Sequence, residues 1–289
     1  MENYEEQLNN LRDEIDKIDD ALHENLVKRT KIVLEIAKVK RSMPNSDRAS
    51  AWHPAREVRI LRRLLGKDSG GFPKTSIFRI WREMFGALTN LQKPFIMAVF
   101  MPQRGAGFLE IARDQFGAYS PFSVCGSVGQ IIRELTENKA SVGVIPIDDS
   151  YDSTSPWWIK MLPSNIKVVA RLPLIGPGEG RGGGKEAYVL AVAPHENTGD
   201  DRSLMVIEVK EEAFSIGSLK EKLKTVDIEI ERICSNYTVN DKEAAYLAEV
   251  QGYISDDDPR IKKLYSSNKN NFSKITIIGG YAVPLDTQA

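Results

Sequence analysis

The sequence is poor in the residues that build disulfide frameworks and metal sites. Its 289 residues include two cysteines, Cys125 and Cys234, which stand far apart and form no Cys-x-x-Cys or Cys/His spacing. Reduced thiols of this kind are typical of cytosolic proteins. The three histidines, His23, His53 and His195, have neither metal-ligand spacing nor the companions of a catalytic triad. We therefore expect no metal site.

An excess of charge of one sign and long apolar runs are missing as well. The 39 basic and 40 acidic residues give a net charge of −1, which favours neither nucleic acid nor a membrane surface as a partner. The longest clean apolar run, Phe95 to Met101, is too short to cross a bilayer. The first residues, MENYEEQLNN, lack the apolar segment of a secretory signal. We expect a cytoplasmic protein of two domains.

The first 93 residues have the periodicity of helices. Apolar residues at heptad spacing predict one long helix of about 50 Å, and they are Leu8, Leu11, Ile15, Ile18, Leu22, Ile32, Ile36 and Val39. Pro54 suits the first position of a second helix, which should end at Gly66. A third helix should end before Pro94 and carry one apolar stripe of Ile77, Ile80, Trp81, Met84, Leu88 and Leu91.

A charged side chain interrupts the apolar seam of the first helix. Arg29 occupies a seam position, where a guanidinium has a large desolvation cost unless an anion meets it. Lys40 lies about 20° from the same direction and about 16 Å along the axis, whereas Arg12 lies about 25 Å from Arg29. If one small anion contacts all three, a second chain must supply Arg12, which predicts an antiparallel or intertwined dimer. Two other interpretations of Arg29 stay open: a solvated surface residue, or a polar residue that fixes helix register.

After Pro94 the pattern becomes that of an α/β region. We expect strands near 95–101, 141–147, 166–174 and 186–194, and helices near 108–116 and 128–139. From Ser203 the order strand, helix, strand, strand, helix, strand predicts a ferredoxin-like βαββαβ unit. The glycine-rich stretch GPGEGRGGGK contains Gly178, Gly180 and Gly183 at G-x-G-x-x-G spacing. A strand pattern follows it rather than a helix, so we interpret it as a linker and not a nucleotide site.

Three runs in the helical part carry a resemblance to a known family. LRDEIDKIDDALHENLVKRTKIVLEIAKVK, HPAREVRILRRLL and IFRIWREMFGALTNLQ resemble the three helices of AroQ-type, all-helical chorismate mutases, in order and spacing over residues 5–92. The resemblance implies a mutase domain at 1–93 that forms an intertwined helical homodimer. It also implies an isomerase of the shikimate pathway that converts chorismate to prephenate, for phenylalanine and tyrosine biosynthesis, without a cofactor.

The resemblance also implies roles for four donor side chains. Arg29 would bind one carboxylate of chorismate within its own subunit, and Arg12 would bind the other across the dimer. Lys40 and Gln92 would donate hydrogen bonds to the ether oxygen, where negative charge grows in the transition state. Guanidinium suits the carboxylates because its planar fork binds them with two parallel bonds.

Two further site residues and two departures come from the second and third helices. By the same resemblance, Glu57 would accept a hydrogen bond from the ring hydroxyl, and Arg56 would support that pocket. Leu88 stands where the family often has a small hydroxyl residue, a contact that Thr89 could supply. His53 replaces a family aspartate just ahead of the second helix. The family contact at that position resembles one made by a backbone N–H, so we expect the replacement to have a mild effect.

The C-terminal region resembles two other modules. Residues 94–195, through ASVGVIPIDDSYDST, resemble the first lobe of prephenate dehydratase, and residues 200–289, through YLAEVQGYISDDDPRI and IIGGYAVPL, resemble an ACT regulatory domain. The Thr-Arg-Phe-type motif of the dehydratases is replaced by GGGKEAYVLAVAP, and the ligand loop of ACT domains by KEEAFSIGSL. We therefore predict no dehydratase activity and a regulatory or structural role, with an aromatic amino acid as a possible effector.

Two alternatives to a mutase with a silent C-terminal region stay open. The helical part could be a dimeric, non-catalytic module that senses a metabolite. The chain could also be a bifunctional mutase and dehydratase, which the missing motif disfavours.

Overall fold

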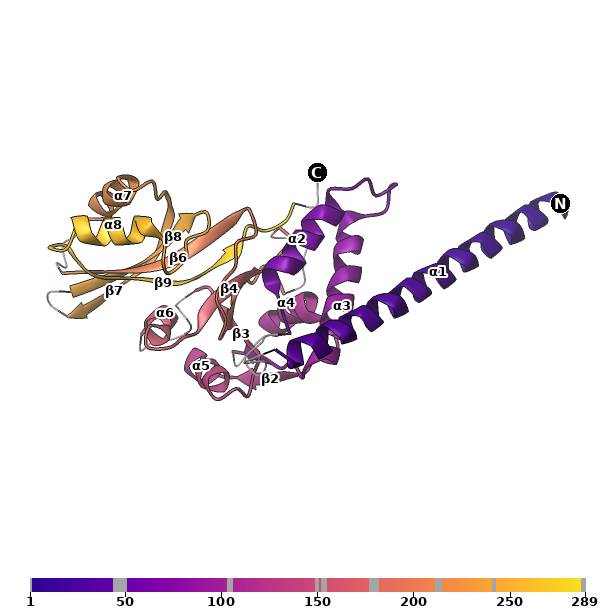
Figure 1. The fold of residues 1–289 in the computed structure, drawn as a ribbon, viewed down its shortest axis with the longest axis horizontal. Helices are drawn as coiled ribbons and strands as arrows, with labels where there is room; N and C mark the ends of the chain where they lie inside the picture. The colour runs from indigo at the N-terminus through magenta and orange to yellow at the C-terminus, as the bar shows by residue number, and fades with distance from the viewer. Residues whose placement is uncertain are drawn as a thin grey trace. The chain divides into compact units, whose positions relative to one another are not determined.

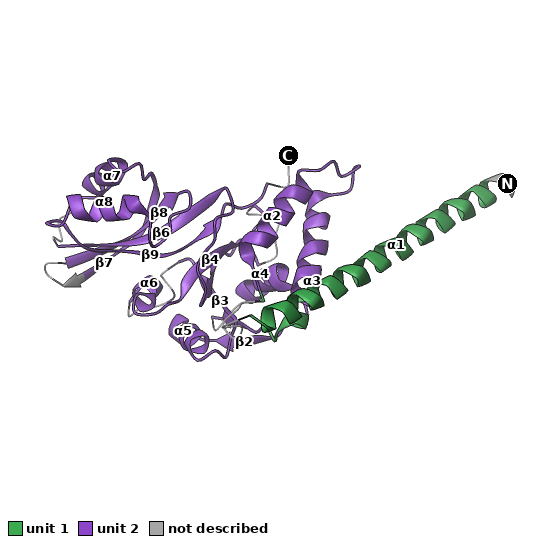
Figure 2. Cartoon of the chain, in the orientation of Figure 1, with its two compact units in different colours: residues 1–51, 88–94 green, residues 52–87, 95–289 purple. Residues whose placement is uncertain are grey.

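A computed structural model shows the chain as two compact units. It describes residues 2–43, 51–102, 106–148, 151, 155–176, 182–210, 215–240 and 243–286. One unit contains residues 1–51 and 88–94, and the other contains residues 52–87 and 95–289, as coloured in Figure 2. The domain boundaries predicted from the sequence, 1–93 and 94–289, remain a prediction. Half of the glycine-rich stretch, including Gly178 and Gly180, lies outside the described residues.

Helix α1 (Glu2–Arg41) is one uninterrupted helix of 40 residues (Figure 1), as the heptad pattern predicts. Its last turn carries Lys38, Lys40 and Arg41, whose charges complement the negative end of the helix dipole. The apolar seam is solvent-exposed within the single chain, since Leu11, Leu22 and Ile32 keep 57%, 59% and 61% of their surface. An amphipathic helix of this kind becomes stable when its apolar face packs against another element.

Helices α2 (Pro54–Leu65) and α3 (Lys74–Gln92) follow in the predicted places. Pro54 stands at the first turn of α2, as expected. The face of α2 formed by Ala55, Val58, Leu61 and Leu65 is buried. Val58, Leu61 and Leu65 pack in one cluster with Phe78 and Phe85 of α3.

The apolar stripe predicted for α3 is only partly buried in the single chain. Ile80 and Leu91 are 51% and 57% exposed, while Phe78 and Phe85 are buried. A helix can bury only one face against a given neighbour, and here that face carries the two large rings. The sequence therefore presents two apolar faces on α3, and the fold of one chain buries the aromatic one.

The α/β region forms one sheet whose strand order is β2-β1-β3-β5-β4-β9-β6-β8-β7. Its first strands are β1 (Met97–Phe100), β2 (Phe122–Cys125), β3 (Val142–Pro146), β4 (Lys167–Leu172) and β5 (Ala187–Ala191). The helices between them are α4 (Gly107–Phe116), α5 (Val128–Thr136) and α6 (Trp157–Met161). Every residue of β1, β3 and β5 is buried, which explains their unbroken apolar sequence.

The predicted ferredoxin-like unit is present. It consists of β6 (Asp201–Val209), α7 (Ile216–Lys224), β7 (Ile230–Asn240), β8 (Glu243–Gln251), α8 (Pro259–Ser267) and β9 (Phe272–Ala282). Its strands lie in the antiparallel order β9-β6-β8-β7, and α7 and α8 cover one face of them (Figure 1). Asp258 is the N-cap of α8, and its side chain accepts a hydrogen bond from the Arg260 N–H.

The two halves of the sheet join where β4 runs parallel to β9, with Val168 opposite Gly279. Gly279 has φ +132°, and a Cβ there would clash with the backbone of Val168, so only glycine fits this junction. The Lys167 ammonium also donates to Asp256 at 2.8 Å. The sheet therefore continues without a break into the ferredoxin-like unit. Among the described residues, no helix is both long and apolar enough to cross a membrane.

Candidate functional site

Helix α1 presents three of the predicted site residues. Arg29 and Lys40 are half-buried, and Arg12 is exposed with its Nη1 donating to Asn9 Oδ1 at 3.3 Å. Because α1 is continuous, Arg12 and Arg29 lie about 25 Å apart at 1.5 Å per residue. Arg12 and Arg29 of one chain therefore cannot both bind the same small ligand.

An open groove of about 400 Å³ lies on the C-terminal part of α1. Its lining residues are Lys31, Ile32, Glu35, Ile36, Val39 and Lys40, all from this one helix. A surface made by one helix cannot surround a substrate. The groove needs a second element before it could exclude water from a reacting molecule.

Gln92 is the last residue of α3 and belongs to the same unit as α1. Its Nε2 donates to Leu88 O at 3.2 Å, and the amide carries a second N–H that can donate elsewhere. Leu88 and the neighbouring Thr89 are both buried. The end of α3 therefore carries the Gln92 amide donor together with Leu88, which departs from the family pattern, and Thr89, which could replace the missing hydroxyl.

The remaining predicted site residues, Arg56 and Glu57, lie on α2 in the other unit. Arg56 is exposed. Glu57 has a largely buried side chain whose Oε2 accepts from Trp52 Nε1 at 3.1 Å and from Arg82 Nη2 at 2.8 Å. These two bonds fix the orientation of the carboxylate. His53, the residue before α2, makes no side-chain cap, although its carbonyl accepts from the Glu57 N–H.

Arg82 is a residue that the sequence reasoning missed. It is only 1% exposed, it donates to Gln115 O at 3.2 Å, and its guanidinium lies against the rings of Phe78 and Phe85. Burial lowers its pKa, while the Glu57 carboxylate raises it and supports the charged form. The signal in the sequence is the run Phe78, Arg82, Phe85 at helical spacing, which places an arginine on a face that is otherwise aromatic.

The electrostatic character of these residues suits an anion and not a metal. Within the described residues, no group of three or more histidine, cysteine or acidic side chains is placed to hold a metal ion. Arg12, Arg29 and Lys40 instead supply positive charge along one helix, and Gln92 supplies an uncharged donor. Guanidinium and ammonium groups of this kind bind carboxylates.

Comparison with known proteins assigns the helical part to a family of domains. Residues 11–93 match the family model described as chorismate mutase type II. This stretch contains α2 and α3 in full, and α1 from its third turn onward. The chain thus carries a chorismate mutase type II domain at its N-terminal end.

Similarity also extends beyond this domain. The chain is 26% identical over 173 residues, 58% of its length and 46% of the relative's, to the bifunctional chorismate mutase/prephenate dehydratase of Aquifex aeolicus (strain VF5). A second such enzyme, from Stutzerimonas stutzeri, is 25% identical over 146 residues, 50% of this chain and 40% of that one. The chain spans less than half the length of these relatives.

Among solved structures, a prephenate dehydratase from Streptococcus mutans has a TM-score of 0.45 and 14% identity, covering 65% of this chain and 97% of that one.

Proposed function

We propose that this protein is a chorismate mutase that converts chorismate to prephenate by an intramolecular Claisen rearrangement. The observation that carries the proposal is the match of residues 11–93 to chorismate mutase type II, within which α1 presents Arg29 and Lys40 on one face. The product would serve phenylalanine and tyrosine biosynthesis. A cytoplasmic location is part of the proposal, because both cysteines are free thiols.

The reaction requires that the protein position the enolpyruvyl ether and stabilise the charge that develops on the ether oxygen. Chorismate is a dianion with a flexible enolpyruvyl ether, and it reacts when the ether is held in a chair-like arrangement. In the proposed site, Arg29 binds one carboxylate and Arg12 of the partner subunit binds the other. Lys40 and Gln92 donate to the ether oxygen and stabilise the negative charge that grows there as the bond breaks.

Glu57 would contribute from α2 by accepting a hydrogen bond from the ring hydroxyl of the substrate, with Arg56 beside it. The bonds from Arg82 and Trp52 hold the Glu57 carboxylate in one orientation, which supports a role that depends on direction. Arg82 is therefore a positioning residue in this proposal.

A homodimer is part of the proposal, and two features of α1 support it. Its apolar seam is exposed in the single chain, and its groove beside Lys40 is open. A second copy of α1 would cover the seam and bring its own Arg12 to the site, which the length of one helix forbids within a chain.

The first test is the loss of chorismate absorbance with prephenate identified as the product. We expect turnover by the wild type, and a loss of about 100-fold or more in kcat for Arg29→Ala and for Lys40→Ala. Lys17→Ala, an exposed change on α1 away from these residues, is the control and should leave the rate unchanged. Full activity in Arg29→Ala would contradict the proposed clamp.

Mixing two inactive variants tests whether the site is shared between chains. After unfolding and refolding together, Arg12→Ala and Arg29→Ala chains form mixed dimers in which one of the two sites has both arginines. We expect about a quarter of the wild-type rate from the mixture. A mixture that stays as inactive as its components would show that one chain supplies the whole site.

The non-catalytic sensor is the alternative if the folded wild type does not turn over chorismate. Chorismate binding without conversion, measured by calorimetry, would then support it. A bifunctional mutase and dehydratase is favoured by the names of the similar relatives. Formation of phenylpyruvate from prephenate would establish it, against our prediction of no dehydratase activity.

For the C-terminal region we propose a regulatory or structural role. An aromatic amino acid is the proposed effector, and phenylalanine or tyrosine should then shift the melting temperature or the mutase kinetics. No shift with any aromatic amino acid would leave only the structural role.

A further inference from the structure

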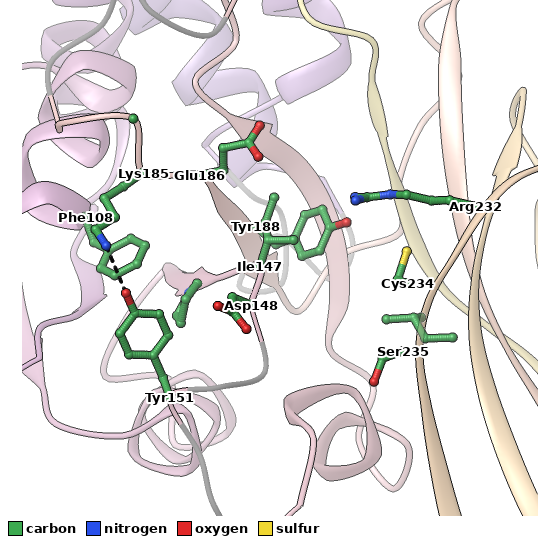
Figure 3. A pocket seen from close by; sticks show the side chains of 13 residues that line it. Phe108, Ile147, Asp148, Tyr151, Lys185, Glu186, Tyr188, Arg232, Cys234 and Ser235 are labelled. Atoms are coloured by element: carbon green, nitrogen blue, oxygen red, sulfur yellow. Dashed lines mark hydrogen bonds between the residues drawn. The ribbon is translucent and has the colours of Figure 1, made fainter.

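A cleft of about 550 Å³ lies in the α/β region, and none of the residues proposed for the mutase lines it. Phe108 of α4, Ile147 and Asp148 after β3, and Tyr188 of β5 line one side, and Arg232 and Cys234 of β7 line the other (Figure 3). The cleft therefore opens where the first part of the sheet meets the ferredoxin-like unit. Its volume lies within the range of about 300–1,000 Å³ that is usual for small-molecule sites.

Tyr188 places an unsatisfied hydroxyl in this cleft. Its side chain is only 1% exposed, and its hydroxyl has no hydrogen-bond partner within the described residues. In Figure 3 the hydroxyl points toward the guanidinium of Arg232. Burial, with Tyr281 nearby, raises the pKa of Tyr188 well above its ordinary value, so the group remains an O–H donor at neutral pH. A buried donor without an acceptor indicates a position that a ligand atom can complete.

Arg232 directs a second set of donors to the same place. Its Nε donates to Glu249 Oε2 at 2.9 Å, and the Glu249 side chain is buried. This bond orients the guanidinium, while its two terminal nitrogens make no hydrogen bond within the described part of the chain. A guanidinium that is held at Nε and open at its terminal nitrogens can bind a carboxylate through two parallel bonds.

The rest of the lining decides what kind of carboxylate fits. Lys185 donates to the Tyr151 hydroxyl at 3.1 Å and lies over the rings of Phe108 and Tyr151, so this side of the cleft is aromatic and cationic. Glu186 is neutralised by Arg171 at 2.7 Å. Asp148 also lines the cleft. The cleft therefore offers one set of donors for a carboxylate, at Tyr188 and Arg232, and an aromatic side for an apolar body.

We propose that this cleft binds a small monocarboxylate, whose carboxylate accepts hydrogen bonds from the Tyr188 hydroxyl and the terminal nitrogens of Arg232. The apolar body of the ligand packs against Phe108, Tyr151 and Ile147. The site uses one strand from each half of the sheet, so the ligand also links β5 to β7. It does not depend on the proposed mutase activity, because none of its residues lies in the helical part.

Calorimetry on the full chain tests this site with two pairs of probes. We expect phenylacetate and hexanoate to bind. Their amides have the same shape without the charge, and their affinity should be lower by about 10-fold or more. Equal affinity of acid and amide would overturn the proposal, as would the failure of both acids to bind the folded protein.

Tyr188→Phe separates the ligand role from a structural one. It keeps the ring and removes a hydroxyl that has no partner in the fold, so the melting temperature should stay the same or rise. The affinity for phenylacetate should nevertheless fall by about 5-fold or more. Tyr119→Phe, at a tyrosine that is 98% exposed, is the matched control and should change neither quantity. Wild-type affinity in Tyr188→Phe would overturn the role of this hydroxyl.

Arg232→Lys tests the guanidinium as the second donor and keeps a cation beside Glu249. The ammonium can still pair with Glu249, but it lacks the two terminal nitrogens of the guanidinium. We therefore expect the affinity for phenylacetate to fall about 10-fold relative to the wild type. If the variant has the wild-type affinity and melting temperature, the carboxylate is not held by the guanidinium.

Discussion

Helix α1 and the sheet bury their apolar side chains to very different extents. Leu22 and Ile32 of α1 keep 59% and 61% of their surface in the single chain, whereas Val144 of β3 and Leu190 of β5 keep none. The strands carry apolar residues on both faces and find covering helices and strands within the same chain. The helix carries them on one face and has a polar opposite face. The sheet is therefore covered within one chain, whereas the apolar face of α1 is exposed there, as the proposed homodimer requires.

Helices α2 and α3 sharpen this contrast. The family match unites them with α1, whereas α2 and most of α3 pack with the α/β region. Leu61 and Phe85 lie in one cluster with Leu174, Ile175 and Leu285 from the α/β region. Arg62 of α2 also donates to the Thr198 and Asp200 carbonyls, both at 2.8 Å. The matched stretch of sequence therefore extends over two structural units.

The largest expected effect comes from a charge on the exposed seam of α1. Leu22→Glu should raise the dimer dissociation constant about 1,000-fold, since each of two copies loses about 2 kcal/mol of apolar burial. The mutase rate should fall with the dimer, while the sheet keeps its fold. Analytical ultracentrifugation with far-UV circular dichroism measures both, and Lys17→Glu on the polar face is the control. A Leu22→Glu variant that remains a dimer would contradict the proposed interface.

Breaking the ion pair that fixes α3 to α2 should have the next largest effect. Arg82→Met leaves the Glu57 carboxylate without its buried cation and should cost about 3–5 kcal/mol of unfolding free energy. The double variant Glu57→Leu with Arg82→Met should recover most of that stability, because no charge is then buried alone. Urea denaturation measures the free energies. A single variant as stable as the wild type would show that the pair does not hold the two helices.

A smaller effect should come from His195, in the connection between β5 and β6 of the α/β region, as the pH changes. Burial lowers the pKa of His195 below its ordinary value near 6.5, so the unfolded chain takes up a proton before the folded one. The stabilising contribution is therefore complete above pH 6.5 and is lost as the pH falls, by at most about 1.4 kcal/mol per pH unit. Unfolding free energies at several pH values should show a flatter profile for His195→Gln than for the wild type.

The exposed His23 of α1 provides the matched control for that profile. His23→Gln removes one histidine, as His195→Gln does, but from an exposed position. If His195→Gln follows the wild type, the buried histidine does not contribute to the pH dependence.

The smallest effect concerns the two thiols of the sheet. Burial raises the pKa of Cys125 and of Cys234 to about 11, which leaves little thiolate at neutral pH. Iodoacetamide should therefore label the native protein slowly at pH 7.5 and faster toward pH 11, as followed by mass spectrometry. The same reagent should label both thiols rapidly in urea. Rapid labelling of the native protein at pH 7.5 would show that the sheet is opened there.

Local patterns predicted most of the elements, and the misses have a common reason. The strand β2 and the helix α6 were not predicted, because they have four and five residues and are too short to show a period. The buried strands β3 and β5 and both helices of the ferredoxin-like unit were predicted from their apolar patterns. Of the candidate site, the sequence indicated Arg29 by its place in an apolar seam, but it gave no local sign that Glu57 is held by Arg82.

The sequence by itself determined the long amphipathic helix, the order of helices and strands, and the positions of the charged residues along them. These features depend on residues a few positions apart, whose relative directions follow from the helix or strand geometry. Only the tertiary structure decided that the sheet runs unbroken through Gly279, that Arg82 meets Glu57, and that Tyr188 faces Arg232 across a cleft. Such contacts join residues far apart in the chain, so they depend on packing that no local pattern contains.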